Sequence, residues 1–157
     1  MRKEEKPKPI KRIEELQPLS REHHFGLLVC WKIKQGIKKG IELERIKKYT
    51  DWFWDKHLQY HFEIEENYIF PILGNKHSLI VQAIKEHQQL KEIFNDQADL
   101  SGSLSQLGQE LQKHIRFEER VLFNEIQKVA TKEELDLVAT VHTSNFKEDY
   151  QDEFWLK

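Results

Sequence analysis

A short pattern of histidine and glutamate occurs twice in this chain. The segments that begin at His61 and at His114, 53 residues apart, both follow the pattern His-x-x-x-Glu-Glu-x-x-aliphatic-Phe. Residues four apart lie on the same face of a helix, so each histidine points the same way as the first glutamate of its copy, Glu65 or Glu118. Two such helices side by side would bring two imidazoles and two carboxylates to one pocket. Helical bundles hold pairs of metal ions in this way.

The composition predicts one small, water-soluble domain. The chain has 157 residues, of which 33% are charged and 38% hydrophobic, and this length suits a single core. Its 25 basic and 27 acidic residues leave a net charge of -2, which offers no electrostatic reason to bind nucleic acid or an anionic membrane.

Cysteine content and apolar runs favour a cytoplasmic location. Cys30 is the single cysteine, so no disulfide can form within the chain, and the first residues contain no apolar signal segment. The longest apolar stretch, 27–31, is far shorter than the ~20 residues needed to span a bilayer.

The spacing of apolar residues predicts helices and no strand. The expected ranges are 20–39, 42–70, 77–97, 104–129 and a fifth from 131 to about 154. Ser20 is the expected cap of the first helix and Gly40 its end, while the polar run 99–103 is expected to separate the third and fourth. Thr131 opens a capping box at the start of the fifth helix.

Four long helices with short connections predict an all-α fold. The expected architecture is an antiparallel up-down four-helix bundle with an additional C-terminal helix. Residues 1–16 are expected to form a charged N-terminal arm and 17–157 the bundle domain, with a metal-binding core at about 18–128.

The candidate ligands are expected to lie at one height in such a bundle. With alternate helices running in opposite directions and a rise of ~1.5 Å per residue, all of them fall in the same half of the molecule. Imidazole nitrogen combined with carboxylate oxygen suits iron, manganese or zinc better than calcium or magnesium. Glutamates that can each offer two oxygens favour a pair of ions. The predicted metal ligands are His23, His61, Glu65, His87, His114 and Glu118.

Helix geometry leaves alternatives near two of these positions. His24 is adjacent to His23 but points about 100° away around the helix, so we favour His23, which lies on the apolar face. Glu119 is available beside Glu118, and the repeat favours Glu118.

Other polar residues could support the site. His57, one turn before His61, could be an extra ligand or could orient another side chain, and Tyr68 on the same stripe could line the pocket. His77, near a loop, and His142, on the fifth helix, are expected to have structural roles only.

These segments resemble the hemerythrin-like family, in its HHE cation-binding branch. The resemblance covers about residues 18–128 and is carried by the segments 19–23, 61–66, 86–90 and 114–119. It implies a non-haem diiron centre bridged by Glu65 and Glu118, with zinc or manganese as substitutes for iron. The four histidines at 23, 61, 87 and 114 would be the terminal ligands.

The chain also departs from the oxygen carriers of this family. Those proteins have two histidines four apart on the third helix, whereas here His87 has Ala83 and Lys91 at the flanking positions. One histidine fewer argues against reversible oxygen carriage unless His24 or His57 completes the ligand shell. An open coordination position would instead suit exogenous ligands, redox chemistry or iron handling.

The resemblance therefore implies a diiron protein that binds or senses oxygen, nitric oxide or peroxide, or handles iron. One alternative is a small diiron oxidase or peroxidase, although the chain has no recognisable substrate motif and an enzyme is the less expected outcome. Another alternative is a structural interaction module with zinc or an empty site.

Overall fold

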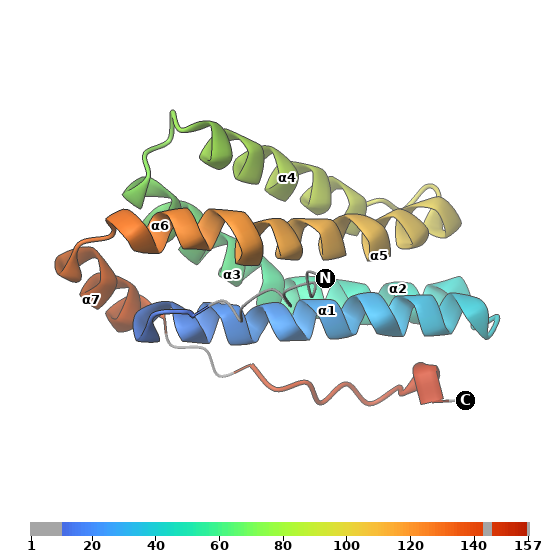
Figure 1. Cartoon of the computed structure of the whole chain (residues 1–157). Coiled ribbons are helices and arrows are strands. Elements are labelled where there is room, and N and C mark those ends of the chain that lie inside the picture. Colours follow the sequence, from blue (N-terminus) through green and yellow to red (C-terminus); the bar gives the residue numbers. More distant parts are fainter. Residues whose placement is uncertain (1–10, 143–145, 157) are drawn as a thin grey trace, which may run out of the picture.

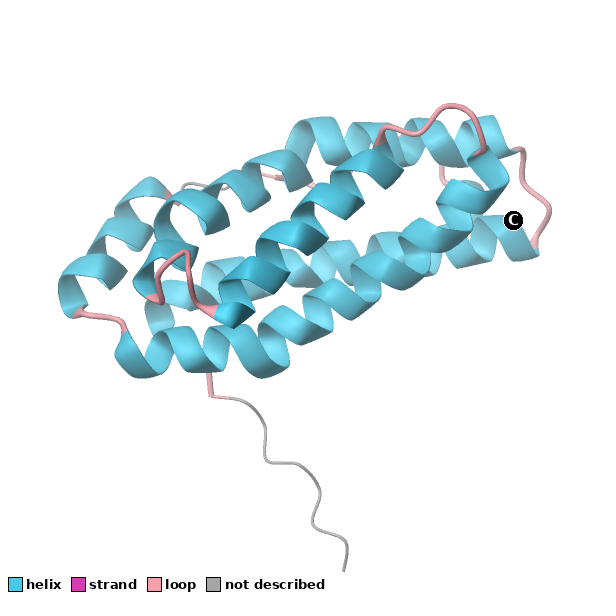
Figure 2. Cartoon of the chain, turned by 90° about the horizontal axis from the view of Figure 1, so that it is seen from above, coloured by secondary structure: helices cyan, strands magenta, loops and turns pink. Residues whose placement is uncertain are grey.

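The structure is a computed structural model that describes residues 11–142 and 146–156. These residues form helices, turns and irregular segments without a strand, so the predicted all-α class is confirmed (Figures 1 and 2). In chain order the α-helices are α1 (Gln17–Lys38), α2 (Leu43–Phe53), α3 (Gln59–Ile64), α4 (Ser78–Phe94), α5 (Leu100–Phe117), α6 (Phe123–Val129) and α7 (Lys132–Val141).

Single π-helical turns join some of these helices end to end. The turns Trp54–Leu58 and Glu65–Ile69 make α2 and α3 part of one continuous helical path, the α2–α3 rod (43–69). The turn Glu118–Leu122 likewise joins α5 and α6 into the α5–α6 rod (100–129). Two of the three π turns begin at Glu65 and Glu118, so the sequence repeat is also a repeat of backbone geometry. Such turns are rare and often mark functional sites.

The long helices lie lengthwise beside one another (Figure 1). Helix α5 contacts α1, α2 and α4. The approach of α1 to α5 is close at Gly26, where an added Cβ would lie 2.6 Å from Ile115 Cδ1. Helix α7 covers one end of the assembly, and the C-terminal segment runs back along α1 (Figure 1).

Two predicted helix starts were wrong by a few residues. Helix α1 begins at Gln17 rather than Ser20, because Pro18 fits the first turn of a helix, where its missing N–H is not needed. Helix α5 begins at Leu100, within the run expected to be a break, because the Asp99 side chain accepts a hydrogen bond from the Gly102 N–H and so caps the helix.

Two predicted helix boundaries are close to the observed ones. Gly40 follows α1 with φ +69°, the left-handed conformation that ends helices. Helix α4 spans Ser78–Phe94 rather than 77–97, and His77 caps it by accepting a hydrogen bond from the Leu79 N–H.

The fifth helix is much shorter than predicted. The capping box at Thr131 is confirmed, but α7 ends at Val141 instead of near residue 154, and residues 143–145 lie outside the described part. Phe146, Tyr150 and Phe154 are spaced four apart like the apolar face of a helix, yet 146–153 is irregular and only Phe154–Leu156 forms a 3-10 turn. Their spacing reflects packing on α1 and the α2–α3 rod rather than a helix.

Only part of the predicted N-terminal arm is described. Residues 1–10 lie outside the described part, whereas Leu16 is fully buried and Arg12 donates hydrogen bonds to the side chain and backbone of Glu119.

The apolar core consists of two clusters with a polar layer between them. One cluster includes Ile33, Phe53 and Leu107, and the other includes Leu19 and Phe123. Between them, α1, α4 and the two rods all contribute buried histidine or glutamate. The apolar clusters hold the helices in place on both sides of this polar layer.

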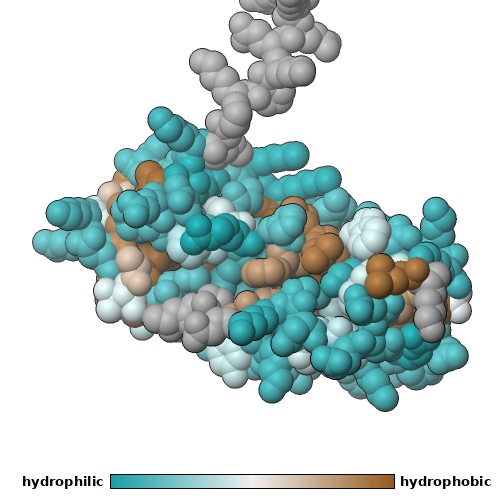
Figure 3. All heavy atoms as spheres, turned by 90° about the horizontal axis from the view of Figure 1, so that it is seen from below, coloured by the Kyte–Doolittle hydropathy of each residue, from teal (hydrophilic) through white to brown (hydrophobic). Residues whose placement is uncertain are grey.

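None of the described helices combines the length and the apolar character that a membrane span requires. Viewed from below, the molecule is largely hydrophilic with separate apolar patches (Figure 3).

Candidate metal centre

The structure brings all six predicted ligands together in the polar layer. His23, His61, Glu65 and Glu118 form one group of potential ligand atoms, and Glu65, His87, His114 and Glu118 form a second. The residues come from α1, α4 and the two rods, and both groups share the two glutamates that begin the π turns.

In the first group the two imidazoles face one oxygen of each shared carboxylate. His23 Nε2 lies 2.9 Å from Glu118 Oε1 and 3.5 Å from Glu65 Oε2. His61 Nε2 lies 3.2 Å from the same Glu65 Oε2.

In the second group the imidazoles face the other oxygen of each carboxylate. His87 Nε2 lies 3.1 Å from Glu65 Oε1 and 3.5 Å from Glu118 Oε2. His114 Nε2 lies 3.2 Å from Glu118 Oε2. Each glutamate therefore offers one oxygen to each group, which is the arrangement of a bridging carboxylate.

The donor atoms are buried and lack hydrogen bonds. Glu65 and Glu118 have no exposed surface, and the four histidines are 2–4% exposed. None of the four Nε2 atoms and four carboxylate oxygens forms a hydrogen bond of acceptable geometry with a described residue. Because unsatisfied buried polar atoms are costly, their concentration here needs a compensating partner. These buried groups could hold metal ions, which would satisfy every one of these atoms.

Each histidine is oriented by a further carboxylate through its other ring nitrogen. The Nδ1 distances are 2.6 Å for His23 to Glu119, 3.0 Å for His61 to Glu22, 2.8 Å for His87 to Glu66 and 2.7 Å for His114 to Glu86. With the proton on Nδ1 donated to the carboxylate, the lone pair of Nε2 points into the centre. Metal-binding histidines are oriented in this way.

The orienting pairs cross between helices. Glu66 and Glu119 follow the shared glutamates on the two rods but contact His87 of α4 and His23 of α1. Conversely, Glu22 on α1 and Glu86 on α4 contact the histidines of the rods. The sequence pointed to Glu119 as an alternative ligand, whereas Glu22, Glu66 and Glu86 were not predicted. A signal was present, since glutamate precedes histidine at both 22–23 and 86–87.

The carboxylates shift the pKa values of the histidines upward in the metal-free protein. Burial alone would lower the pKa of His61, but the charge of Glu65 and the hydrogen bond to Glu22 raise it to about 9. Burial likewise opposes ionisation of Glu118, yet His114 and the other histidines hold its pKa well below the usual range. The cluster thus retains protons that a metal ion would have to displace.

His24 and Tyr68, two of the alternative residues, differ in burial. His24 is exposed to solvent, and Tyr68 is half-buried against the apolar cluster that contains Phe123. The choice of His23 over His24 therefore agrees with the geometry.

His57 belongs to a third buried group, with Glu22 and His61. Its Nδ1 lies 3.8 Å from Glu22 Oε2, and its ring stacks on Phe146 with a centroid distance of 4.3 Å. Burial lowers the pKa of His57 to about 4, so this imidazole is neutral near pH 7.

His142 is more closely connected to the centre than expected. Its Nε2 lies 2.8 Å from Glu22 Oε1, the same oxygen that accepts a hydrogen bond from His61. No local pattern pointed to this contact, because it depends on where α7 ends and how it docks.

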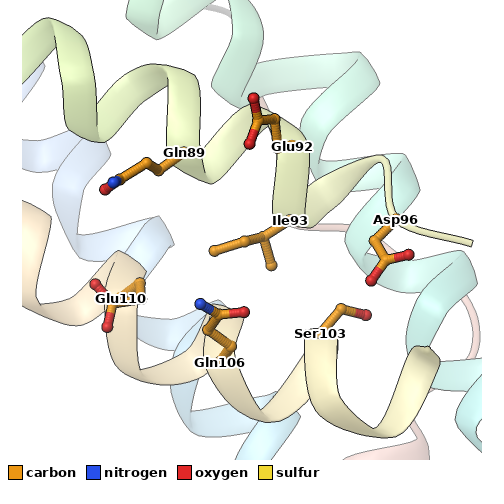
Figure 4. Close-up of a pocket in the computed structure, with 7 residues that line it drawn as sticks. All are labelled: Gln89, Glu92, Ile93, Asp96, Ser103, Gln106 and Glu110. Atoms are coloured by element: carbon orange, nitrogen blue, oxygen red, sulfur yellow. The ribbon is translucent and has the colours of Figure 1, made fainter. Parts of the chain in front are cut away.

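A pocket away from the candidate centre lies between α4 and α5. It has a volume of about 650 Å³ and is lined mainly by polar side chains, including Glu92, Asp96 and Glu110 (Figure 4). It contains none of the predicted site residues, so cavity size does not lead to the candidate centre.

Comparison of the chain with protein-family models, curated proteins and solved structures finds no match.

Proposed function

We propose that this chain is a diiron protein of the hemerythrin-like type. Glu65 and Glu118 would be shared by two iron ions, His23 and His61 would hold one of them, and the histidines at 87 and 114 would hold the other. The protein binds or senses oxygen, nitric oxide or peroxide, or holds iron.

One observation carries this proposal. Two buried groups of donor atoms share both Glu65 and Glu118, and none of the eight atoms has a hydrogen bond with a described residue. A structural ion pair would leave fewer such atoms, because buried carboxylates and imidazoles are normally paired by direct hydrogen bonds.

The proposed architecture is an antiparallel four-helix bundle formed by α1, the α2–α3 rod, α4 and the α5–α6 rod. It is supported by the order of the core residues. Helix α1 passes from the cluster of Leu19 to that of Ile33, whereas the α2–α3 rod passes from Phe53 back to Ile69. Helix α4 runs from the cluster of Leu19 to that of Ile33, like α1, and the α5–α6 rod runs in the opposite direction, like the α2–α3 rod. This alternation fits an up-down arrangement.

The number of donors suits either a closed zinc site or an iron site that keeps free positions. Each ion would have two imidazole nitrogens and two carboxylate oxygens from the protein. Four ligands complete the tetrahedral sphere of structural zinc, whereas iron in mixed nitrogen and oxygen sites accepts further ligands. When bound, a pair of iron ions supplies one-electron chemistry and free positions for small molecules. The chain itself excludes bulk water and orients each imidazole.

The deciding experiment is the metal content and absorption spectrum of protein purified from iron-fed cells without chelator. We expect about two iron ions per chain and near-ultraviolet charge-transfer absorption. Stoichiometric zinc without iron would favour the structural alternative, and absence of metal under every loading condition would exclude the proposal.

Adjacent histidines provide a matched pair of variants for this experiment. His23→Ala removes a proposed ligand, whereas His24→Ala removes an exposed imidazole one position away. We expect the first to lose iron from one position and the second to retain both ions. Glu65→Ala and Glu118→Ala should each lose both ions, because removing a bridge leaves two cations close together with less negative charge between them.

A further inference from the structure

The buried position of the centre requires a route by which ions reach it. All eight donor atoms are covered by protein, and the four orienting carboxylates lie around them. The exposure of these carboxylates differs widely. The side chain of Glu22 is 6% exposed, those of Glu86 and Glu119 are 26% exposed, and that of Glu66 is 41% exposed.

The three less exposed carboxylates, those of Glu22, Glu86 and Glu119, each have a second hydrogen-bond partner. Glu22 has His142 as a second hydrogen-bond partner, Glu119 has Arg12, and Glu86 accepts a hydrogen bond from the Gln82 side chain. Among the described residues, Glu66 has His87 as its hydrogen-bond partner and no second one. The side of the centre at Glu66 is therefore the least closed.

A cavity opens on this same side. It has a volume of about 300 Å³ and is lined by His87, by Phe62, which stacks on the His87 ring at 3.7 Å, and by the charged residues Glu63, Glu66 and Lys91. A divalent ion with about six water molecules needs roughly 180 Å³, at about 30 Å³ per water. The cavity can therefore admit a hydrated ion next to a proposed ligand.

We propose that this cavity, between the α2–α3 rod and α4, is a loading site through which divalent transition-metal ions such as Fe²⁺ enter and leave the centre. Glu63 and Glu66 attract the hydrated cation, and Glu66 then delivers it to the side of the centre formed by His87. Lys91 opposes the cation. This inference depends on the proposed function, because it assumes that the centre takes up metal.

The decisive variants change the cavity and leave the ligands and orienting carboxylates intact. Glu63→Gln removes one attracting charge, Lys91→Gln removes the opposing one, and Gln88→Trp fills the cavity without a charge change. Glu92→Gln is the matched control, because Glu92 is one residue from Lys91 but lines the larger pocket of Figure 4.

The measurement is stopped-flow uptake of Fe²⁺ under anaerobic conditions, followed by release into excess chelator. One charge acting on a doubly charged ion across about 6 Å of water at about 0.15 M salt changes a rate about threefold. We expect uptake and release to slow about threefold in Glu63→Gln and to accelerate about threefold in Lys91→Gln. Gln88→Trp should slow both rates at least as much, and Glu92→Gln should match the wild type.

The final stoichiometry should remain two ions per chain in all four variants, because a group on the route affects both directions equally. If two ions load at wild-type rates in Glu63→Gln and Gln88→Trp, the loading site is refuted while the proposed function stands. If the wild-type protein takes up no iron at equilibrium, the proposed function fails and the loading site fails with it.

Discussion

Replacing Glu119 with glutamine tests whether the orienting pairs cross between helices. Glu119 lies on the rod that carries His114, but its Oε1 is 2.6 Å from Nδ1 of His23 on α1. Glutamine keeps the size of the side chain and removes its charge. We therefore expect the ion at His23 and His61 to weaken, while the ion at the other two histidines is nearly unchanged.

The expected magnitude follows from the contact and its exposure. Losing a carboxylate that orients a metal-binding histidine typically lowers affinity about 10- to 100-fold. Because the Glu119 side chain is 26% exposed, water screens part of its charge, so we expect the lower end of this range. A loss of about tenfold corresponds to about 1.4 kcal/mol.

Anaerobic calorimetric titration with Fe²⁺ in a double-mutant cycle measures this effect. In a His23→Ala background, Glu119→Gln should change nothing further, whereas in a His87→Ala background its cost should be fully retained. Glu125→Gln is the control, because Glu125 is on the same rod and pairs with Lys128 at the surface. Full additivity with His23→Ala, or coupling to His87→Ala instead, would refute the crossed assignment.

Three further outcomes are expected. In the metal-free protein, His61 stabilises the fold fully below pH 6.5, the ordinary pKa of histidine, and this contribution is lost as the pH rises through its folded pKa of about 9. Glu65 and Glu118 have lowered pKa values, so they stabilise the fold above pH 4.5, the ordinary pKa of glutamate, and this contribution is lost at lower pH. Urea unfolding should therefore give its highest free energy between about pH 4.5 and 6.5, and a steady rise towards pH 9 would contradict this. His142→Ala removes the second hydrogen bond to Glu22, so iron affinity measured by titration should fall a few-fold, in contrast to the exposed His24→Ala. Glu148→Ala leaves the buried Lys32 ammonium and the Tyr49 hydroxyl without their shared partner. It should lower the free energy of unfolding in urea by about 3 kcal/mol, with or without metal. The control Glu153→Ala, at an exposed glutamate, should have little effect.

The sequence was sufficient for those features that depend on local helix geometry. Apolar spacing predicted the all-α class, and the four-residue interval within the repeat predicted that His61 and Glu65, like His114 and Glu118, share a face. The register of the helices then predicted which other histidines would join them. Each of these predictions uses the period and rise of a single helix.

The spacing of apolar residues gave a wrong prediction for the C-terminal segment, where tertiary packing decides the backbone conformation. The aromatic residues Phe146, Tyr150 and Phe154 have the spacing of a helical face, but their segment is held irregular against α1 and the α2–α3 rod. The three π turns, at Trp54–Leu58, Glu65–Ile69 and Glu118–Leu122, were also not predicted.

The tertiary structure alone decided which carboxylate orients which histidine. Glu22 meets His61 and Glu119 meets His23 across 39 and 96 residues of chain. Such contacts are set by the rotation of each helix about its own axis and by the packing of its neighbours. The sequence determined which donor atoms could meet at one height, because helix period and rise are local properties. How each imidazole is oriented, and which side of the centre is open, depends on distances between helices that no local pattern contains.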